Sequence, residues 1–434
     1  MADLNRRKFL EASSASLVGA SLMGTSARWA GANDRIRVAV LGLGGRGRSH
    51  IREASVNQGV EVVALCDPDR KRLETAAAEH QKAEGVKARC ETDLRRILED
   101  KEIDVVSGAT TNHWHALATI WACQAGKHVY VEKPVSHNLA EGRKMIEAAR
   151  KYKRFVATGT QRRSNGSFRK VMELIHGGVI GDIYLARCEY PQPRPALGFK
   201  QPEPPPPWLE WDLWVGPAPQ QPYHANLVHY NWHWFWDFGN GEIGNNGPHF
   251  LDILRWGMRK GLPVRVQSVG GRFGEKDQAQ TPNTQRTTMV YEDGSELVND
   301  IRGVFAGEGF SWDFFGSKGY MHLNYRHIGK SYGCTYEVFL GRSKTPEPNQ
   351  GEYPDVEHYS NFITALRAGK PELLNADITE GHLSAGLCHL ANISYRVGRE
   401  LRFDPKTERF VGDEEANRLL DRQYRKPFAV PEKV

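Results

Sequence analysis

Closely spaced pairs of cysteines are missing from this sequence of 434 residues. The six cysteines are scattered along the chain without a Cys-x-x-Cys pair, and several stand in apolar runs. A free thiol in such a run packs as a small hydrophobic side chain. The cysteine pattern therefore excludes a small fold that is held together by disulfide bonds.

A concentrated basic stripe is also missing. The formal net charge is only +6, whereas nucleic-acid-binding proteins normally collect their basic residues on one face. We therefore expect no nucleic-acid partner. A hydrophobic fraction of 40% is ordinary for a globular protein. A chain of this length exceeds one compact core, which favours two domains.

Long hydrophobic runs are absent as well, and the apolar stretch at residues 12–24 is too short to span a bilayer. It follows Asn5–Leu10 (NRRKFL) and precedes the small residues Ala30–Ala32. This order is typical of a signal peptide, and the paired arginines resemble the twin-arginine motif. We expect residues 1–32 to direct export of the folded protein to the periplasm or another extracytoplasmic compartment, without a stable membrane anchor. The alternative is an amphipathic helix, which frequent serine and glycine disfavour.

From residue 33 to residue 159, strand-like runs alternate with helix-like runs. The strands are expected at residues 36–41, 60–66, 104–107, 128–132 and 155–159. The helices are expected at residues 46–54, 70–84, 115–125 and 139–152. Such alternation predicts an α/β Rossmann domain with a doubly wound parallel sheet, covered by helices on both faces.

A glycine turn follows the first strand and opens the first helix; it consists of Gly42, Leu43, Gly44, Gly45, Arg46 and Gly47. A GxGxxG pattern in this context lets the backbone approach a pyrophosphate at the helix N-terminus. Asp67 ends the second strand, where an acid accepts ribose hydroxyls and repels a 2′-phosphate. NAD is therefore preferred over NADP, although residues 70–72 (RKR) lie close by. The alternative is a turn without a ligand.

Two more segments follow strands at the edge of the sheet where ligands bind. Residues 110–115 include the candidate cofactor contacts Thr110, Asn112 and His115. The second segment is Glu132-Lys133-Pro134, and Gln161 follows the last strand at the same edge. We expect Glu132, Lys133 and Gln161 to contact the cofactor as well. Taken alone, Lys133 is better interpreted as a surface lysine at a strand end.

Together, the glycine turn, the Thr-Asn-His-Trp-His loop and Glu132-Lys133-Pro134 resemble the Gfo/Idh/MocA family of glucose–fructose oxidoreductases and inositol dehydrogenases. The resemblance covers residues 33–434. It implies a second α/β domain, residues 160–434, with a large and mainly antiparallel sheet. One face of that sheet would carry the substrate pocket and the other a subunit interface, so a homo-oligomer is expected. It also implies that Lys133 lies near the nicotinamide and the reacting hydroxyl.

The second half of the sequence agrees with this expectation. Strand-like runs are expected at residues 183–190, 264–269, 286–291, 296–301 and 310–315, after a helix over residues 167–176. Runs of this kind with turns between them favour an antiparallel sheet. Pro202–Pro207 (PEPPPP) cannot continue a helix or a central strand. We interpret it as an ordered surface arm that is able to reach a neighbouring subunit.

The segment at residues 230–236 (YNWHWFW) is unusually aromatic. Aromatic faces beside polar groups suit a sugar ring, which is apolar on its C–H faces. The candidate substrate-binding residues are Tyr230, Trp232, His233 and, after the last Rossmann strand, Arg163. Core packing or an interface is the alternative for the aromatic rings. His229 and His233 are four residues apart, but no acidic or cysteine ligand accompanies them, so no metal is expected.

Asn245 and His249 complete the candidate catalytic set with Lys133. The resemblance implies an aspartate four residues before the catalytic histidine, and here that position is Asn245. An amide can orient a hydroxyl but cannot carry a proton away, so His249 is the candidate for a single base.

These features predict an NAD-dependent oxidoreductase that transfers hydride between a sugar or polyol carbinol and a tightly bound nicotinamide. Two alternatives stay open. One is an NAD-dependent glycosidase that oxidises its substrate transiently, and the other is a catalytically silent sugar-binding protein, which Asn245 keeps in consideration.

Overall fold

The structure is a computed structural model that describes residues 35–307, 309–328, 331–347 and 356–434. The expected export signal, residues 1–32, lies outside the described residues. Among the described residues, no helix is both long and apolar enough to cross a membrane.

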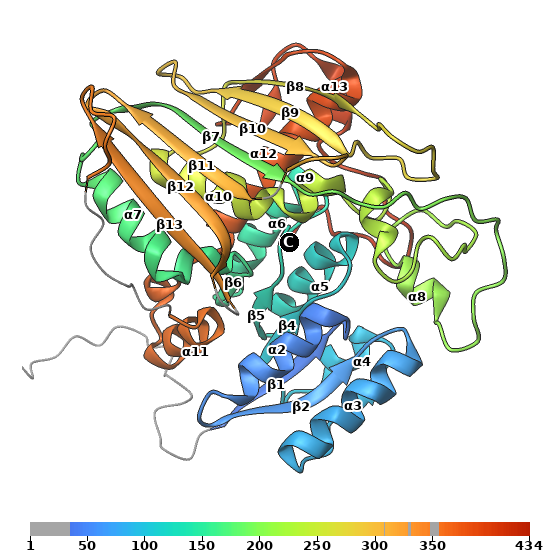
Figure 1. The fold of residues 1–434 in the computed structure, drawn as a ribbon. Coiled ribbons are helices and arrows are strands. Elements are labelled where there is room, and N and C mark those ends of the chain that lie inside the picture. Colours follow the sequence, from blue (N-terminus) through green and yellow to red (C-terminus); the bar gives the residue numbers. More distant parts are fainter. Residues whose placement is uncertain (1–34, 308, 329–330, 348–355) are drawn as a thin grey trace, which may run out of the picture.

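The first half forms a six-stranded parallel sheet with the order β3-β2-β1-β4-β5-β6 (Figure 1). Its strands are β1 (Ile36–Leu41), β2 (Val60–Cys66), β3 (Arg89–Glu91), β4 (Val105–Gly108), β5 (His128–Val131) and β6 (Val156–Thr158). The helices between them are α2 (Gly45–Ser55), α3 (Arg70–Glu84), α4 (Leu94–Glu99), α5 (Asn112–Gln124) and α6 (Leu139–Lys151). The predicted doubly wound Rossmann architecture is confirmed.

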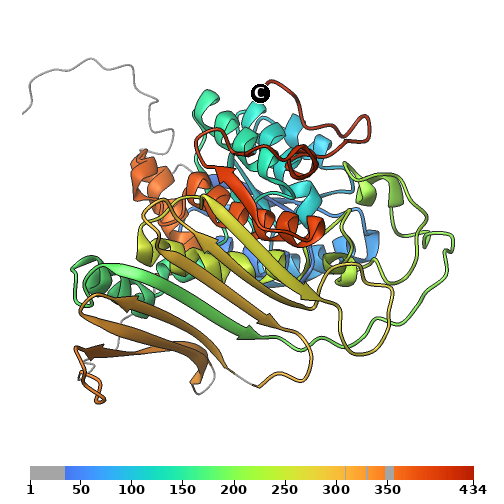
Figure 2. The ribbon, with the colours of Figure 1, turned by 90° about the horizontal axis from the view of Figure 1, so that it is seen from above.

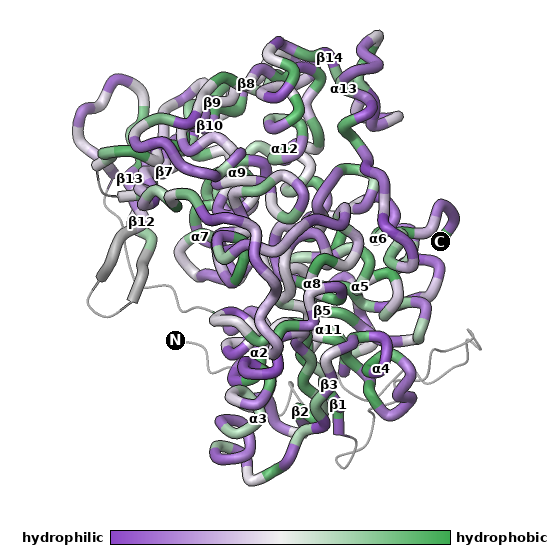
Figure 3. The backbone as a smooth tube through the Cα atoms, turned by 90° about the vertical axis from the view of Figure 1, so that its right-hand side faces the viewer, coloured by the Kyte–Doolittle hydropathy of each residue, from purple (hydrophilic) through white to green (hydrophobic). Residues whose placement is uncertain are grey.

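Burial explains why these segments form strands. Five of the six residues of β1 are buried, as expected for a strand that helices cover on both faces. In Figure 3 the strands of this sheet are mostly hydrophobic, whereas the outer helix α3 is mostly hydrophilic. Helix α3 begins after Asp69, whose side chain accepts a hydrogen bond from Arg72 N, and ends at Gly85 with φ 72°.

A second sheet of nine strands has the order β13-β12-β11-β7-β10-β9-β8-β14-β15. The strands are β7 (Ile183–Pro191), β8 (Arg265–Gly271), β9 (Thr284–Val290), β10 (Glu296–Arg302), β11 (Phe310–Gly316), β12 (Gly319–Ile328), β13 (Ser331–Leu340), β14 (Leu401–Asp404) and β15 (Arg409–Phe410). Strands β7 and β10 pair in parallel, and the other described pairs are antiparallel. The predicted large, mainly antiparallel sheet is confirmed.

Helices cover one face of this sheet. They are α7 (Gly166–His176), α10 (Gly247–Met258) and α12 (Ile378–Val397), and they share one hydrophobic core with the strands. Figure 2 looks onto the opposite face of the sheet, which none of the described helices covers. The sheet and its helices therefore form two layers, and the helical layer faces the Rossmann half (Figure 1).

A long connection, residues 192–240, joins β7 to α9 (Gly241–Asn245) and is called here the crossing segment. It contains the short helices α8 (Trp211–Val215) and η3 (Asn231–Trp234) and has its own aromatic core. Pro202–Pro207 has no regular structure and is largely exposed, as expected. The segment then returns to the Rossmann half, where Leu209 forms a bridge with Asp69.

The C-terminal elements also cross back to the first half, and Ala157 of β6 forms a bridge with Asp377. Helix α11 (His358–Ala368) packs on α2, and α12 packs on α6. The remaining elements are η2 (Gln161–Ser164), η4 (Pro371–Leu373) and α13 (Glu414–Arg418). The predicted domain boundary between residues 159 and 160 stays a prediction. Two residues from the C-terminal part of the chain, Tyr359 and Phe428, pack with the Rossmann core.

Candidate active site

A cavity of about 560 Å³ lies at the carboxyl ends of the parallel strands, between the Rossmann half and the crossing segment. The structure brings sixteen of the predicted site residues to its walls: Gly42, Gly44, Gly45, Arg46, Asp67, Thr110, Asn112, His115, Glu132, Lys133, Gln161, Tyr230, Trp232, His233, Asn245 and His249. Leu43, Gly47 and Arg163 do not line it.

The glycine turn has the shape that a dinucleotide requires. Gly42 has φ 80°, and a Cβ atom there would lie 2.5 Å from Ala109 O. A Cβ atom on Gly47 would lie 1.8 Å from Gly42 O, whereas one on Gly45 meets nothing within 4 Å. Gly42 and Gly47 therefore let the turn close, and Gly45 leaves open space at the N-terminus of α2. This is a corrected role for Gly47, which was expected to contact the cofactor itself.

Asp67 lies at the end of β2, as expected, and is buried. Its carboxylate accepts hydrogen bonds from Leu43 N at 2.7 Å and from Asp69 N at 2.9 Å. Burial raises the pKa of this carboxyl group, and the two backbone donors oppose the rise. Leu43 thus orients Asp67 through its backbone, while its buried side chain belongs to the Rossmann core.

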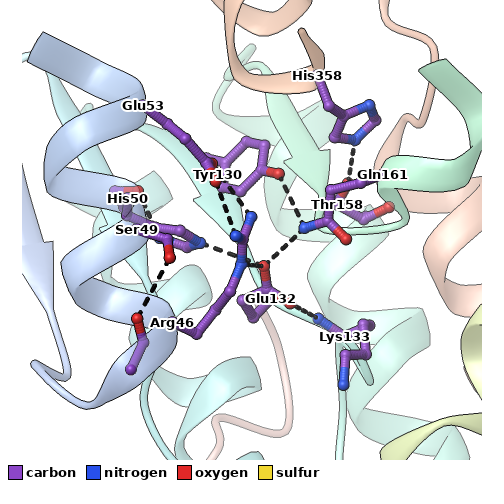
Figure 4. Close-up of polar contacts among 12 residues, drawn as sticks. Arg46, Ser49, His50, Glu53, Tyr130, Glu132, Lys133, Thr158, Gln161 and His358 are labelled. Atoms are coloured by element: carbon purple, nitrogen blue, oxygen red, sulfur yellow. Dashed lines mark hydrogen bonds and ion pairs between the residues drawn. The ribbon is translucent and has the colours of Figure 1, made fainter. Parts of the chain in front are cut away.

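A buried charge network holds Glu132 in place (Figure 4). Arg46 Nε donates to Glu132 Oε1 at 2.5 Å, and Gln161 Nε2 donates to the same oxygen at 2.8 Å. His50 Nε2 lies 3.2 Å from it, and Arg46 also pairs with Glu53. Burial opposes ionisation of Glu132, but Arg46 and His50 outweigh it and hold the carboxyl pKa well below its usual value.

Glu132 therefore serves as a fixed anion behind Lys133. Its other oxygen accepts a hydrogen bond from Lys133 N at 3.2 Å. The Lys133 side chain reaches across the cavity, and its Nζ donates to Asn245 O at 2.7 Å and lies 3.5 Å from Asn245 Oδ1. Burial lowers the pKa of the Lys133 ammonium. The lysine after β5 thus meets residues that lie more than a hundred positions later in the sequence.

Asn245 ends α9, and His249 lies in the first turn of α10 behind Pro248. The Nδ1 atom of His249 is buried and has no hydrogen-bond partner among the residues that the structure describes. Burial, and then the nearby Lys133, lowers the pKa of His249 well below its usual value. The cavity therefore presents a neutral imidazole close to a cationic lysine.

The aromatic residues form one wall of the cavity. Trp232 and His233 stack with ring centroids 3.6 Å apart, and half of the Tyr230 surface is exposed (50%). His233 Nδ1 lies 2.5 Å from Tyr230 O. Since a carbonyl oxygen only accepts, the proton is on Nδ1 and Nε2 is left as an acceptor. Burial lowers the pKa of His233 to about 3, so this imidazole is neutral as well.

His229 and His233 do not act as a pair. His229 Nε2 lies 2.8 Å from Asp69 Oδ2, and its ring stacks on Trp208. In the part of the chain that the structure describes, no three His, Cys, Asp or Glu side chains are arranged to hold a metal ion. His229 instead attaches the crossing segment to the Rossmann half.

The loop at residues 110–115 contacts two other loops of the chain. His115 Nδ1 lies 2.6 Å from Pro134 O, and Nε2 lies 3.0 Å from Thr110 O. Asn112 Nδ2 donates to Asn240 Oδ1 at 3.3 Å. The contacts with Pro134 and Asn240 give the cavity walls a defined position, because each one joins the loop to another segment of the chain.

Arg163 was expected to bind substrate, and the structure corrects this expectation. Its guanidinium donates to both oxygens of Asp252, at 2.8 and 2.9 Å, and to Glu380 at 2.8 Å. The side chain is buried behind the cavity and lines none of it. Two carboxylates already satisfy this arginine, so it fixes α10 against α12.

Several residues that line the cavity were not predicted as site residues, namely Arg72, Thr92, Asp93, Leu94 and Trp214. Residues 92–94 follow the short strand β3, which was not predicted because only three residues form it and none is fully buried. A strand there would have placed Asp93 at the ligand-binding edge. Arg72 lies in the first turn of α3, close to Asp67.

Comparisons with known proteins agree with this geometry. Residues 36–160 match a family model described as the NAD-binding Rossmann fold of an oxidoreductase family. Residues 198–430 match the model for the C-terminal alpha/beta domain of the same family. The prediction of an NAD-binding Rossmann domain is confirmed.

Two curated relatives are inositol dehydrogenases. The chain is 29% identical over 170 residues to inositol 2-dehydrogenase of Salmonella typhimurium, which covers 39% of this chain and 49% of that protein. It is 31% identical over 160 residues to myo-inositol 2-dehydrogenase of Thermotoga maritima, covering 37% and 46%. The chain thus spans about half the length of the curated relatives that it matches.

Two solved structures share the fold. The WlbA dehydrogenase of Bordetella pertussis, in complex with NADH and UDP-GlcNAcA, has a TM-score of 0.65 at 20% identity, over 85% of this chain and 99% of that one. The aldose-aldose oxidoreductase of Caulobacter crescentus, complexed with glycerol, has a TM-score of 0.64 at 18% identity, over 85% and 100%.

Proposed function

The chain belongs to the Gfo/Idh/MocA oxidoreductase family, and we propose that it is an NAD-dependent oxidoreductase acting on a CH–OH group of a sugar or polyol. One observation carries the proposal. Lys133, Asn245 and His249 meet at a single cavity that also contains the glycine turn and Asp67. The open space at Gly45 and the N-terminus of α2 fit a pyrophosphate.

His249 would accept the hydroxyl proton as the carbinol carbon gives up hydride. A neutral imidazole suits this task, and proton transfer by a positioned side chain contributes about 10²–10⁴-fold to a rate. Lys133 would stabilise the substrate oxygen as it becomes a carbonyl oxygen. When bound, NAD supplies the hydride acceptor.

Asn245 would orient neighbouring side chains and would not itself transfer a proton. Its backbone oxygen accepts from Lys133 Nζ, and its Nδ2 donates to the Tyr230 hydroxyl at 3.3 Å. The amide therefore links the lysine to the aromatic wall and orients both. The single base of the reaction would be His249.

The aromatic wall supports a sugar or polyol as substrate. Trp232 and Tyr230 offer apolar surface for C–H faces, and His233 Nε2 offers an acceptor for a hydroxyl. The curated relatives that act on inositol, a ring of carbinols, agree with this substrate class.

The crossing segment supports retention of the cofactor. It returns to the residues directly after Asp67, where Arg70 N donates to Trp208 O at 2.9 Å and Glu210 N donates to Pro68 O at 2.9 Å. An exported enzyme would not draw on a pool of free NAD, so we propose that the protein leaves the cytoplasm with its cofactor enclosed. The twin-arginine motif expected in residues 1–32 supports export of the folded chain.

A redox-assisted glycosidase is a second candidate, because a second neutral imidazole, His233, faces the same cavity. Transient oxidation of one carbinol acidifies the neighbouring C–H, and a second base would remove that proton before the aglycone leaves. Release of an aglycone without net NADH formation would distinguish this reaction from net oxidation.

The uncovered face of the nine-stranded sheet supports a homo-oligomer. Val269 is an exposed hydrophobic side chain on this face, and Phe315, Tyr320 and Phe339 stack across neighbouring strands. A second copy of the chain would bury this face.

The test starts with native mass spectrometry of the purified protein, which reports bound NAD and subunit number together. Addition of sugars and inositols should then change the nicotinamide absorbance. The variants His249→Ala and Lys133→Met should lose turnover by at least about 10²-fold and still carry NAD. Wild-type rates in both variants would exclude these roles, and bound NAD without any absorbance change would favour the silent sugar-binding protein.

A further inference from the structure

In the described part of the chain, the hydroxyl group of Tyr230 contacts two hydrogen-bond donors. Asn245 Nδ2 lies 3.3 Å from the hydroxyl oxygen, and the Arg194 guanidinium donates a second hydrogen bond to it. A guanidinium and an amide nitrogen donate and do not accept. The Tyr230 oxygen is therefore the acceptor in both contacts, and its own proton is used in neither.

The orientation of the Asn245 amide follows from its contact with Lys133. Lys133 Nζ lies 2.7 Å from Asn245 O and 3.5 Å from Asn245 Oδ1. An ammonium group only donates, so the side-chain atom that faces it is the oxygen, and the atom that faces Tyr230 is the nitrogen. The Tyr230 proton therefore cannot be donated to Asn245.

Arg194 is held in place by a buried carboxylate. Its Nε and Nη2 atoms donate to the two oxygens of Glu242 at 3.0 and 3.3 Å, and Glu242 is only 2% exposed. The guanidinium carbon lies 5.8 Å from the ring centroid of Tyr230 and 5.5 Å from that of Trp234. A two-pronged arginine–carboxylate pair has a defined geometry. Arg194 therefore approaches the Tyr230 hydroxyl from a fixed direction.

The cavity is the direction that remains for the Tyr230 proton. Tyr230 lines the cavity together with His233, and their ring centroids are 4.6 Å apart. His233 presents the opposite function, because its Nδ1 donates to Tyr230 O and its Nε2 is left as an acceptor. The aromatic wall thus offers one donor and one acceptor side by side, called here the Tyr230–His233 pair.

We infer that the Tyr230–His233 pair binds one hydroxyl group of the substrate, which accepts a hydrogen bond from Tyr230 Oη and donates one to His233 Nε2. This inference rests on the proposed function and narrows its substrate class. Asn245 contacts both Lys133 and Tyr230, so the bound hydroxyl lies close to the reacting carbinol. The substrate is then a sugar or polyol with a free hydroxyl on the carbon next to the one that is oxidised.

Only a hydroxyl group satisfies both members of the pair. An ether or carbonyl oxygen accepts but cannot donate, and an ammonium group donates but cannot accept. A site built to hydrogen-bond a hydroxyl rejects the analogue that lacks it, since its polar groups are then left without partners. The pair would therefore determine specificity at this one position of the substrate.

The test measures kcat/KM for D-glucose and myo-inositol and for their monodeoxy analogues, each of which lacks a single hydroxyl. In the wild type, the analogue without the bound hydroxyl should be poorer than its parent by at least about tenfold. Tyr230→Phe keeps the ring, and His233→Phe keeps an aromatic ring against Trp232. Each should reduce this discrimination by at least about threefold, and both should do so for the same analogue.

The control is Tyr223→Phe, in the same crossing segment but away from the cavity, which should discriminate as the wild type does. A folded and active Tyr230→Phe protein with unchanged discrimination would overturn the inference. Two variants that lose discrimination for different analogues would overturn it as well. Thermal unfolding shows whether each variant is folded.

The inference and the proposed function can fail separately. A wild-type protein that carries NAD and oxidises no sugar or polyol would refute the proposed function. Calorimetric titration of D-glucose, myo-inositol and the same analogues into the NAD-loaded protein then judges the pair without turnover. Weaker binding of one analogue in the wild type, and a smaller difference in Tyr230→Phe, would support it. Equal differences in both proteins, or no binding at all, would overturn it.

Discussion

At the scale of single residues, side chains with the same chemistry have different roles because their neighbours differ. Arg162 and Arg163 are adjacent in the sequence, yet one lies against aromatic rings and the other pairs with two carboxylates. Arg163 was predicted to bind substrate from its position after the last Rossmann strand. That prediction was wrong in a way that sequence cannot reveal, because Asp252 and Glu380 approach from α10 and from the start of α12.

The Arg163–Asp252 pair should be important for stability. Asp252→Asn removes the carboxylate that accepts two buried hydrogen bonds from the Arg163 guanidinium. The free energy of unfolding should therefore fall by about 3–5 kcal/mol. Chemical denaturation measures this. The control is Asp293→Asn in the exposed pair with Lys260, which should cost less than about 1 kcal/mol. Equal effects of the two substitutions would contradict the proposed role of the buried pair.

At the scale of elements, the glycine turn depends on two close backbone approaches. Gly47→Ala would place a Cβ atom 1.8 Å from Gly42 O, so the turn must open and NAD should bind at least about tenfold more weakly. Gly45→Ala, in the same turn but with open space, should bind NAD within a few-fold of the wild type. Titration calorimetry with NAD measures both. A Gly47→Ala protein with unchanged affinity would show that the turn does not hold the dinucleotide.

The crossing segment should control release of the cofactor. Lys71 Nζ lies 4.8 Å from the centroid of the Trp208 ring, and Arg70 pairs with Glu210. The double variant Trp208→Ala, Glu210→Ala removes both contacts without altering a residue that lines the cavity. NAD should then dissociate about tenfold faster, and more of it should be lost on gel filtration.

The control for this experiment is Glu203→Ala, an exposed residue of the same segment whose side chain takes part in no ion pair or hydrogen bond in the described structure. It should release NAD at the wild-type rate. If the double variant retains NAD as well as the control does, the crossing segment does not enclose the cofactor.

At the scale of the whole molecule, buried neutral histidines should make stability depend on pH. Burial lowers the pKa of His113, His128, His233 and His389 to about 3 each. Below pH about 6.5 the unfolded chain binds these protons and the folded chain does not. The stabilisation is therefore present above that pH and falls as the pH drops from about 6.5 toward 3.

Urea denaturation at a series of pH values measures this slope, which is about 1.4 kcal/mol per pH unit for each proton. His128→Asn should reduce the slope by one proton, because an amide oxygen can accept the hydrogen bond that Phe155 N donates to His128 Nδ1. A slope that is unchanged in this variant would show that His128 is not a buried neutral histidine.

Much of the fold was predictable because local patterns encode it. The ranges of β1, β2 and α3 match their predictions residue for residue, since buried strands and capped helices have strong signals in sequence. The hairpin of β12 and β13 was missed. In strand β12 the side chains that point to the uncovered face are polar, for example His322 and Asn324. They interrupt the hydrophobic pattern of the strand.

By itself, the sequence determined the parallel sheet, the glycine turn with its acid, and the separate motifs around Lys133, Tyr230 and His249. These features depend on neighbours within a few residues, so periodicity and turn chemistry reveal them. Tertiary structure alone decided that Lys133 Nζ reaches Asn245, that Arg163 is paired while Arg162 lies against aromatic rings, and that residues 192–240 fold back beside Asp67. Each of these outcomes depends on packing between segments far apart in the chain, and no local pattern carries that information.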